Sequence, residues 1–116
     1  MSKALLNDWT ERLGLQEWTI KLEDCCDPDN MYSKDCAGCT RWTEVGKAAV
    51  IQIIDPDRYG ERVIPFDYEK TLVHELLHLK TCLLTDVEDP LTERVGHMLI
   101  DDLARIMVAL KREAME

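Results

Sequence analysis

Two histidines with a glutamate between them lie in one short stretch of this chain, His74-Glu75-Leu76-Leu77-His78. Residues four apart lie on the same face of an α-helix, so a helix here would turn both imidazoles toward one metal ion. Glu75 leaves the same turn at a different angle, where it can take a proton from a water molecule beside the ion but is poorly placed to replace a histidine. The spacing predicts His74 and His78 as metal ligands and Glu75 as a catalytic base.

The residues around the pentapeptide favour a helix from Tyr68 to Lys80. Leucines and a valine give this segment an apolar face made of good helix formers, and Pro65 and Asp67 just upstream indicate a helix start. A core helix with two incidentally spaced, hydrogen-bonded histidines is the alternative. The chain has three histidines, and two of them stand at this one spacing with a glutamate between them, which favours the metal site.

The pentapeptide in its helical setting resembles the HExxH motif of the zincin metallopeptidases. In its small size the chain resembles the compact single-domain gluzincins, also called minigluzincins. It also resembles small zincin-like proteins that phages and prophages often encode. The resemblance implies a Zn²⁺ cofactor and hydrolysis of peptide bonds, with Glu75 as the base. It also implies a peptide or protein substrate that lies extended along a sheet edge.

The third metal ligand must come from outside the pentapeptide, because a catalytic zinc takes three protein ligands and keeps one position open. The last predicted helix offers Glu93 and His97 one turn apart, with Asp101 one turn further. In the gluzincins that the chain resembles, a glutamate on the following helix is the third ligand, and the resemblance assigns this role to Glu93. With Glu93 as the ligand, His97 would hydrogen-bond Glu93 or donate to the developing oxyanion during catalysis. Alternatively, His97 is itself the third ligand. The alternative is that both are solvated surface residues.

The chain before the motif predicts one helix and three strands. Apolar residues at helical spacing predict a first helix that begins near Ser2 and ends at Gly14. Alternation over residues 18–22 predicts a half-buried strand, and residues 25–35 have the composition of a loop. Strands over residues 40–43 and 48–54 form a predicted hairpin, and the second is apolar enough to be central or covered on both faces.

After the motif helix, residues 85–90 form a polar link that ends in a helix cap, Asp89, followed by Pro90 in the first helical position. The last helix is expected to run to about Lys111 and to bury one apolar stripe. The members of this stripe are Leu91, Val95, Leu99, Leu103, Ile106 and Leu110.

The predicted order is a helix, a small three-stranded antiparallel or mixed sheet, and two helices packed on one face of the sheet. This is an α+β fold in a single domain over residues 1–116, because the chain is too short for two hydrophobic cores. Zincins have their elements in the same order, so the resemblance implies a minimal zincin-like domain.

Composition limits the partners. A formal net charge of −9 argues against binding to a phosphate backbone, so no nucleic acid is expected. No apolar run approaches the ~20 residues that a membrane span needs, and Asn7 and Asp8 interrupt the apolar start that a signal peptide would require. The expected location is the cytoplasm, without a membrane partner.

Four of the five cysteines lie close together in the sequence, at Cys25, Cys26, Cys36 and Cys39. The two-residue gap between Cys36 and Cys39 is typical of a zinc knuckle, but the adjacent first pair is not. A second, structural metal site and unligated thiols in a surface loop therefore both stand as interpretations. A ligand role for Cys39, as in deformylases, is a further alternative. Cys82 is expected to be a small buried residue.

Two functions would use the same metal. One is a peptidase, and the other is a zinc-stabilised binding or regulatory module without turnover. Glu75 favours the peptidase, because a purely structural site needs no base and closes its fourth position with a protein ligand. A DNA-associated protease with a third histidine ligand is disfavoured by the acidity of the chain.

Overall fold

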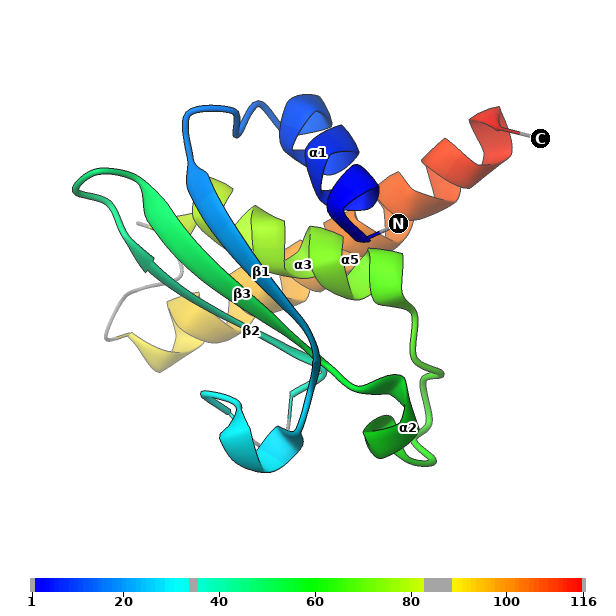
Figure 1. The fold of residues 1–116 in the computed structure, drawn as a ribbon. Helices are drawn as coiled ribbons and strands as arrows, with labels where there is room; N and C mark the ends of the chain where they lie inside the picture. Colours follow the sequence, from blue (N-terminus) through cyan, green and yellow to red (C-terminus); the bar gives the residue numbers. More distant parts are fainter. Residues whose placement is uncertain (1, 34–35, 83–88, 116) are drawn as a thin grey trace.

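A computed structural model describes residues 2–33, 36–82 and 89–115 of the chain. Figure 1 shows a small sheet with the long helices gathered on one side of it. In chain order the elements are α1 (Ser2–Arg12), β1 (Thr19–Cys26), the 3₁₀ helix η1 (Pro28–Asn30), β2 (Gly38–Thr43), β3 (Ala48–Ile54), α2 (Pro56–Tyr59), α3 (Tyr68–Lys80) and α5 (Pro90–Ala114). The α+β class is confirmed by this arrangement.

The sheet has the strand order β1-β3-β2, so β3 is central and β2 is an edge strand. β3 pairs parallel with β1 and antiparallel with β2, which makes the sheet mixed. Ile51 and Ile53 of β3 are fully buried against the helices, and Ile54 is buried on the opposite face. The predicted central strand is therefore confirmed, as is the hairpin, in which Gly46 takes a positive φ of 84°.

Helix α3 lies at the centre of the molecule, in contact with α1, α5, β2 and β3. Asp67 caps it by accepting a hydrogen bond from the backbone N–H of Lys70 (3.1 Å), as the sequence predicts. Leu72, Val73 and Leu76 are fully buried in the main core. Because α3 contacts both the sheet and α5, it can hold side chains in fixed positions relative to each.

A polar network also joins the three helices. Glu69 of α3 accepts a hydrogen bond from Trp9 Nε1 of α1 (2.8 Å) and another from Lys111 Nζ of α5. Lys111 also lies 3.0 Å from Asp8 of α1. The network lies at the end of α3 where the chain enters it, and it ties the C-terminal part of α5 to the body of the molecule.

The buried face of α5 differs from the predicted one. The face that packs on α3 carries Gly96, Ile100, Ala104 and Val108. The six residues of the predicted stripe are instead 37–68 % exposed. The prediction was wrong because Gly96 and Ala104 allow the backbone of α5 to approach α3 closely, while the larger leucines would hold the two helices apart.

Smaller differences concern the segments next to the strands. β1 continues to Cys26, with an irregular register after Glu23 and a positive φ of 51° at Cys25, where the sequence predicts a loop. Aspartate caps at Asp27 and Asp55 begin the short helices η1 and α2, which periodicity cannot detect at this length.

Helix α5 begins at Pro90 with Asp89 as its N-cap, as predicted. The polar link before it lies largely outside the described residues, which resume at Asp89. Within the described part of the chain, no helix is both long and apolar enough to cross a membrane.

Candidate metal centre

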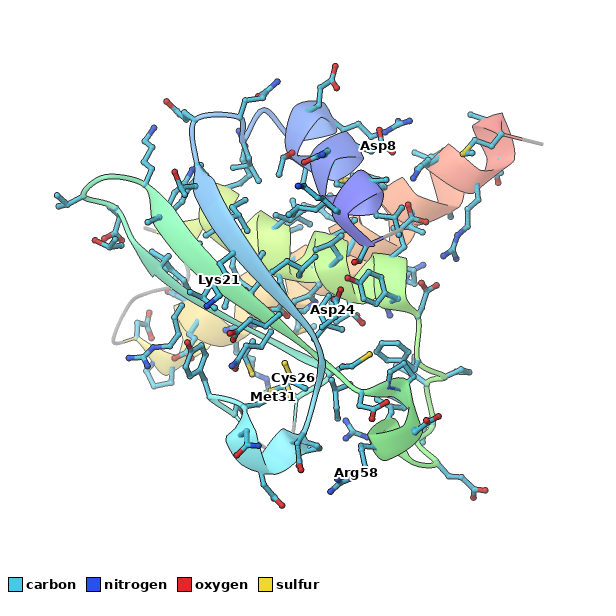
Figure 2. The ribbon with its side chains drawn as sticks, in the orientation of Figure 1. Asp8, Lys21, Asp24, Cys26, Met31 and Arg58 are labelled. Carbon is cyan, nitrogen blue, oxygen red and sulfur yellow. The ribbon has the colours of Figure 1, made fainter. Side chains whose placement is uncertain are left out.

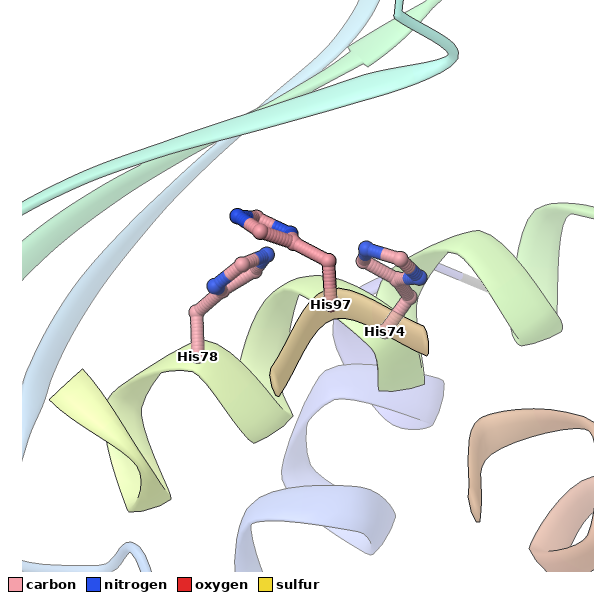
Figure 3. A group of neighbouring side chains, drawn as sticks. All are labelled: His74, His78 and His97. Atoms are coloured by element: carbon pink, nitrogen blue, oxygen red, sulfur yellow. The ribbon is translucent and has the colours of Figure 1, made fainter. Parts of the chain in front are cut away.

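Three imidazoles meet between α3 and α5. His74 and His78 lie one turn apart on α3, and His97 comes from the second turn of α5 (Figure 3). Their ligand nitrogens all lie within 4.8 Å of one another. The ring centroids of His78 and His97 are 4.9 Å apart, and those of His74 and His78 are 5.3 Å apart. Among the described residues, this is the one group of three or more potential ligands that could share an ion.

The donor set fits a zinc ion. Zinc–imidazole bonds of about 2.0–2.1 Å in tetrahedral geometry place neighbouring nitrogens about 3.4 Å apart, so the ligand nitrogens need to close by up to about 1.4 Å. Rotation about the side-chain bonds of a half-exposed His97 can supply this movement. Three histidines would leave the fourth position of a tetrahedral ion open, which is typical of catalytic rather than structural zinc.

The two α3 histidines are held in the neutral form that binds metals. Burial lowers the pKa of His78 to about 4, and the neighbouring His74 and His97 act in the same direction. Burial also lowers the pKa of His74, although the nearby Asp101 opposes this effect. At neutral pH both rings therefore offer a lone pair without first losing a proton.

Asp101 contacts one of these rings. It lies one turn after His97 on α5, and its Oδ1 is 3.4 Å from Nδ1 of His74. A carboxylate on one ring nitrogen fixes the tautomer and leaves the other nitrogen for the ion. The sequence identifies Asp101 only as a further possible ligand, although its spacing of four from His97 is a signal for this role.

Glu93, to which the resemblance assigns the third ligand, is not a member of the group. Its Oε1 lies 3.9 Å from Nε2 of His97, and its side chain is 52 % exposed. The structure thus brings His97 to the motif histidines and leaves Glu93 beside His97, toward solvent.

Glu75 is almost fully buried, with 4 % of its surface exposed. Its Oε1 accepts a hydrogen bond from Oγ1 of Thr40 in β2 (2.6 Å). Burial raises the pKa of Glu75 to about 7, and the Thr40 hydrogen bond offsets part of this effect. A carboxyl group with a pKa near neutrality can both accept and return a proton at physiological pH.

The backbone of β2 passes very close to Glu75 at Gly38. A Cβ at this position would lie 2.9 Å from Cγ2 of Thr71 and 3.0 Å from Cγ of Glu75. Sequence reasoning missed Gly38 and Thr40 as parts of the site. A glycine at the start of a strand, where another element has to approach the backbone, is the signal that could have indicated Gly38.

A groove runs past the candidate site along β2. It consists of two hollows of about 270 and 390 Å³ that share Cys36, Gly38, His74 and Glu75 in their walls. The larger hollow extends to the other two histidines and to Trp42, whose ring stacks on His78 at a centroid distance of 6.4 Å. The smaller one extends to Phe66 and Tyr59.

The cysteines do not gather into a second centre of this kind among the described residues. Cys39 is buried with Met31 and Ile54, and Cys26 packs against the same small cluster (Figure 2). Burial raises the pKa of the Cys39 thiol to about 11, which disfavours the thiolate that zinc binds. Cys25 and Cys36 are exposed. Cys82 is buried, as predicted.

Comparison of the chain with protein-family models, curated proteins and solved structures found no match.

Proposed function

We propose that the chain is a zinc-dependent metallopeptidase of the zincin type. The observation that carries this proposal is the meeting of three imidazoles from α3 and α5 with a buried carboxyl group, Glu75, in one groove beside an edge strand. A structural zinc site has no need for the carboxyl group, and it is normally closed by a fourth protein ligand.

His97 is the third ligand in this proposal, in place of Glu93. The proximity of its nitrogen to those of His74 and His78 supports the choice, as does the carboxylate of Asp101 one turn later, which is in place to orient His74. Glu93 is then a nearby carboxylate, 3.9 Å from Nε2 of His97, and not a ligand. The proposed centre has three histidine ligands and departs from the gluzincin ligand set.

When bound, zinc would polarise the scissile carbonyl and acidify a water molecule. Glu75 takes the proton of the attacking water and passes it to the nitrogen of the leaving amine. Thr40 fixes the rotation of the carboxylate through its 2.6 Å hydrogen bond, so the accepting oxygen keeps one direction throughout the reaction.

The substrate class is a peptide in extended conformation. Among the described strands β2 pairs with β3 alone, and side chains of β2 line the groove. An extended peptide can add to such an edge through main-chain hydrogen bonds, which would place a peptide bond near Glu75 and the histidines. Binding along a strand edge predicts that main-chain contacts dominate over side-chain pockets.

The direct test is cleavage of a mixed peptide library by the full chain with one equivalent of zinc, followed by mass spectrometry. The wild-type chain should cleave, zinc removal by a chelator should stop cleavage, and zinc addition should restore it. The Glu75→Gln variant is the matched control, because it keeps the size of the side chain and removes the base. A zinc-loaded wild-type chain that cleaves no peptide would favour the alternative, a zinc-stabilised binding module.

A further inference from the structure

Helix α5 presents a long apolar face that no other described element covers. Seven large side chains on it are between 37 and 68 % exposed: Leu91, Val95, Met98, Leu99, Leu103, Ile106 and Leu110. We call these residues the α5 stripe. The stripe lies beside the face that packs on α3, so α5 is apolar on more of its circumference than the molecule buries.

The size of the α5 stripe is the first argument for a partner. Its half-exposed side chains together present on the order of 500 Å² of apolar surface, toward the upper end of the ~300–600 Å² found for the largest patch on a typical monomer. Two such faces placed together would bury about 1,000 Å², which is the lower limit for a specific interface.

The spacing of the stripe is the second argument. Leu99, Leu103, Ile106 and Leu110 follow one another at intervals of four, three and four residues, the apolar repeat of helices that pack side by side along a seam. In Figure 1 the C-terminal turns of α5 extend beyond the ends of α1 and α3, so a second helix can approach there.

The helix dipoles give the direction of the pair. An antiparallel pair of α5 helices opposes the two dipoles, whereas a parallel pair would align them.

We propose that the α5 stripe binds the same stripe of a second copy of this chain, as an antiparallel helix pair. The twofold axis passes between Ala104 and Arg105. Leu103 then faces the partner's Ile106, and Leu99 faces the partner's Leu110. His97 and Asp101 lie on a different face of α5, so the interface does not depend on the proposed peptidase activity.

The first experiment measures mass by sedimentation equilibrium over a concentration series of the full chain. The wild type should reach about twice the 13.4 kDa of one chain. Leu103→Glu and Ile106→Glu should each raise the dimer Kd by ~100-fold or more, because each places a charge in the centre of the interface. Val63→Glu, at a fully exposed apolar residue outside the stripe, is the matched control and should leave the dimer unchanged.

Thermal melts of each variant separate loss of the dimer from loss of the fold, since all these side chains are exposed in the single chain. A wild-type chain that stays monomeric at ~100 µM would overturn the proposal, since specific interfaces generally bind more tightly than this. Equal weakening of the dimer by Val63→Glu would also overturn it.

The second experiment tests the antiparallel register. Leu99→Glu and Leu110→Lys should each weaken the dimer, and the double variant should recover at least tenfold (~1.4 kcal/mol) in Kd, because each glutamate then faces the partner's lysine. A parallel pair would place glutamate against glutamate and lysine against lysine. A double variant weaker than both single variants would therefore contradict the proposed register.

Discussion

Thr40 Oγ1 donates a 2.6 Å hydrogen bond to Glu75 Oε1, and this contact joins the edge strand β2 to the central helix α3. The carboxyl group is buried, so few other hydrogen-bond donors can reach its oxygens. The contact therefore fixes Glu75 relative to the strand that borders the groove. A substrate bound along β2 would meet the base in a constant position.

The first prediction concerns Glu75 as the base. Glu75→Gln should lower the rate of peptide cleavage by ~10²–10⁴-fold, the usual contribution of general-base catalysis. Zinc content should stay at the wild-type level, because the three candidate ligands are histidines and Glu75 is not among them. Cleavage kinetics and metal analysis on the same samples check both parts, and a variant with the wild-type rate would exclude Glu75 as the base.

The second prediction concerns the close approach at Gly38. Gly38→Ala should lower the free energy of unfolding by about 1–3 kcal/mol, as expected for overpacking, since the new Cβ would meet Cγ2 of Thr71 at 2.9 Å. Chemical denaturation provides the measurement. Adding Thr71→Ser removes that methyl group while keeping the hydroxyl that bonds Asp67, so the double variant should recover part of the loss.

No recovery in the Gly38→Ala, Thr71→Ser double variant would mean that the contact with Thr71 is not the source of the strain. An unchanged stability of Gly38→Ala itself would contradict the close packing of β2 on α3.

The third prediction concerns Asp101 as the residue that positions His74. Asp101→Asn should lower zinc affinity ~10–100-fold, the range found when the carboxylate behind a ligand histidine is lost. Competition with a zinc chelator gives the affinity. Asp102→Asn is the matched control, because Asp102 is exposed and contacts Arg105 of its own helix. Equal affinities for the two variants would show that Asp101 does not act on His74.

The fourth prediction concerns acid stability. Arg112 near the end of α5 bonds both oxygens of Asp67 (2.8 and 3.0 Å) and lowers the pKa of Asp67, against the opposing effect of burial. An acid with a lowered folded pKa stabilises the fold above its unfolded pKa of about 4, and this contribution is lost as pH falls through the folded pKa. Asp67→Asn keeps the helix cap but loses the ion pair, at a cost of ~0.5–1 kcal/mol near neutral pH.

Melting curves of wild type and Asp67→Asn between pH 2 and 7 check this prediction. The difference in Tm should shrink as the pH falls below about 4 and Asp67 becomes protonated. A difference that stays constant over the whole range would show that the charge of Asp67 plays no part.

Local signals in the sequence predict much of this fold. Asp67 and Asp89 mark the starts of α3 and α5 because a helix cap depends on neighbouring residues alone. The apolar run of residues 48–54 predicts a strand that is central or covered on both faces for a similar reason, since a continuous apolar run leaves no polar face for solvent. The motif histidines also follow from local geometry, because helical spacing alone brings them to one face.

The rest depends on contacts between distant segments. Thr40 meets Glu75 across 35 positions in the chain, and no local pattern indicates this pairing. The buried face of α5 was predicted wrongly, because an apolar stripe indicates a face that can be buried but does not indicate which element packs on it. His97 rather than Glu93 joins His74 and His78 for the same reason, since the rotation of α5 depends on which of its faces packs on α3, here the one with Gly96 and Ala104.

The most direct test of the account is the zinc content of the purified chain by elemental analysis, with single variants at the three histidines and at Glu93. We expect one zinc per chain in the wild type, loss of that zinc in His74→Ala, His78→Ala and His97→Ala, and retention in Glu93→Ala. Retention of the zinc in all three histidine variants would contradict a centre at this site. Loss in Glu93→Ala together with retention in His97→Ala would contradict the three-histidine centre and return the third ligand to Glu93.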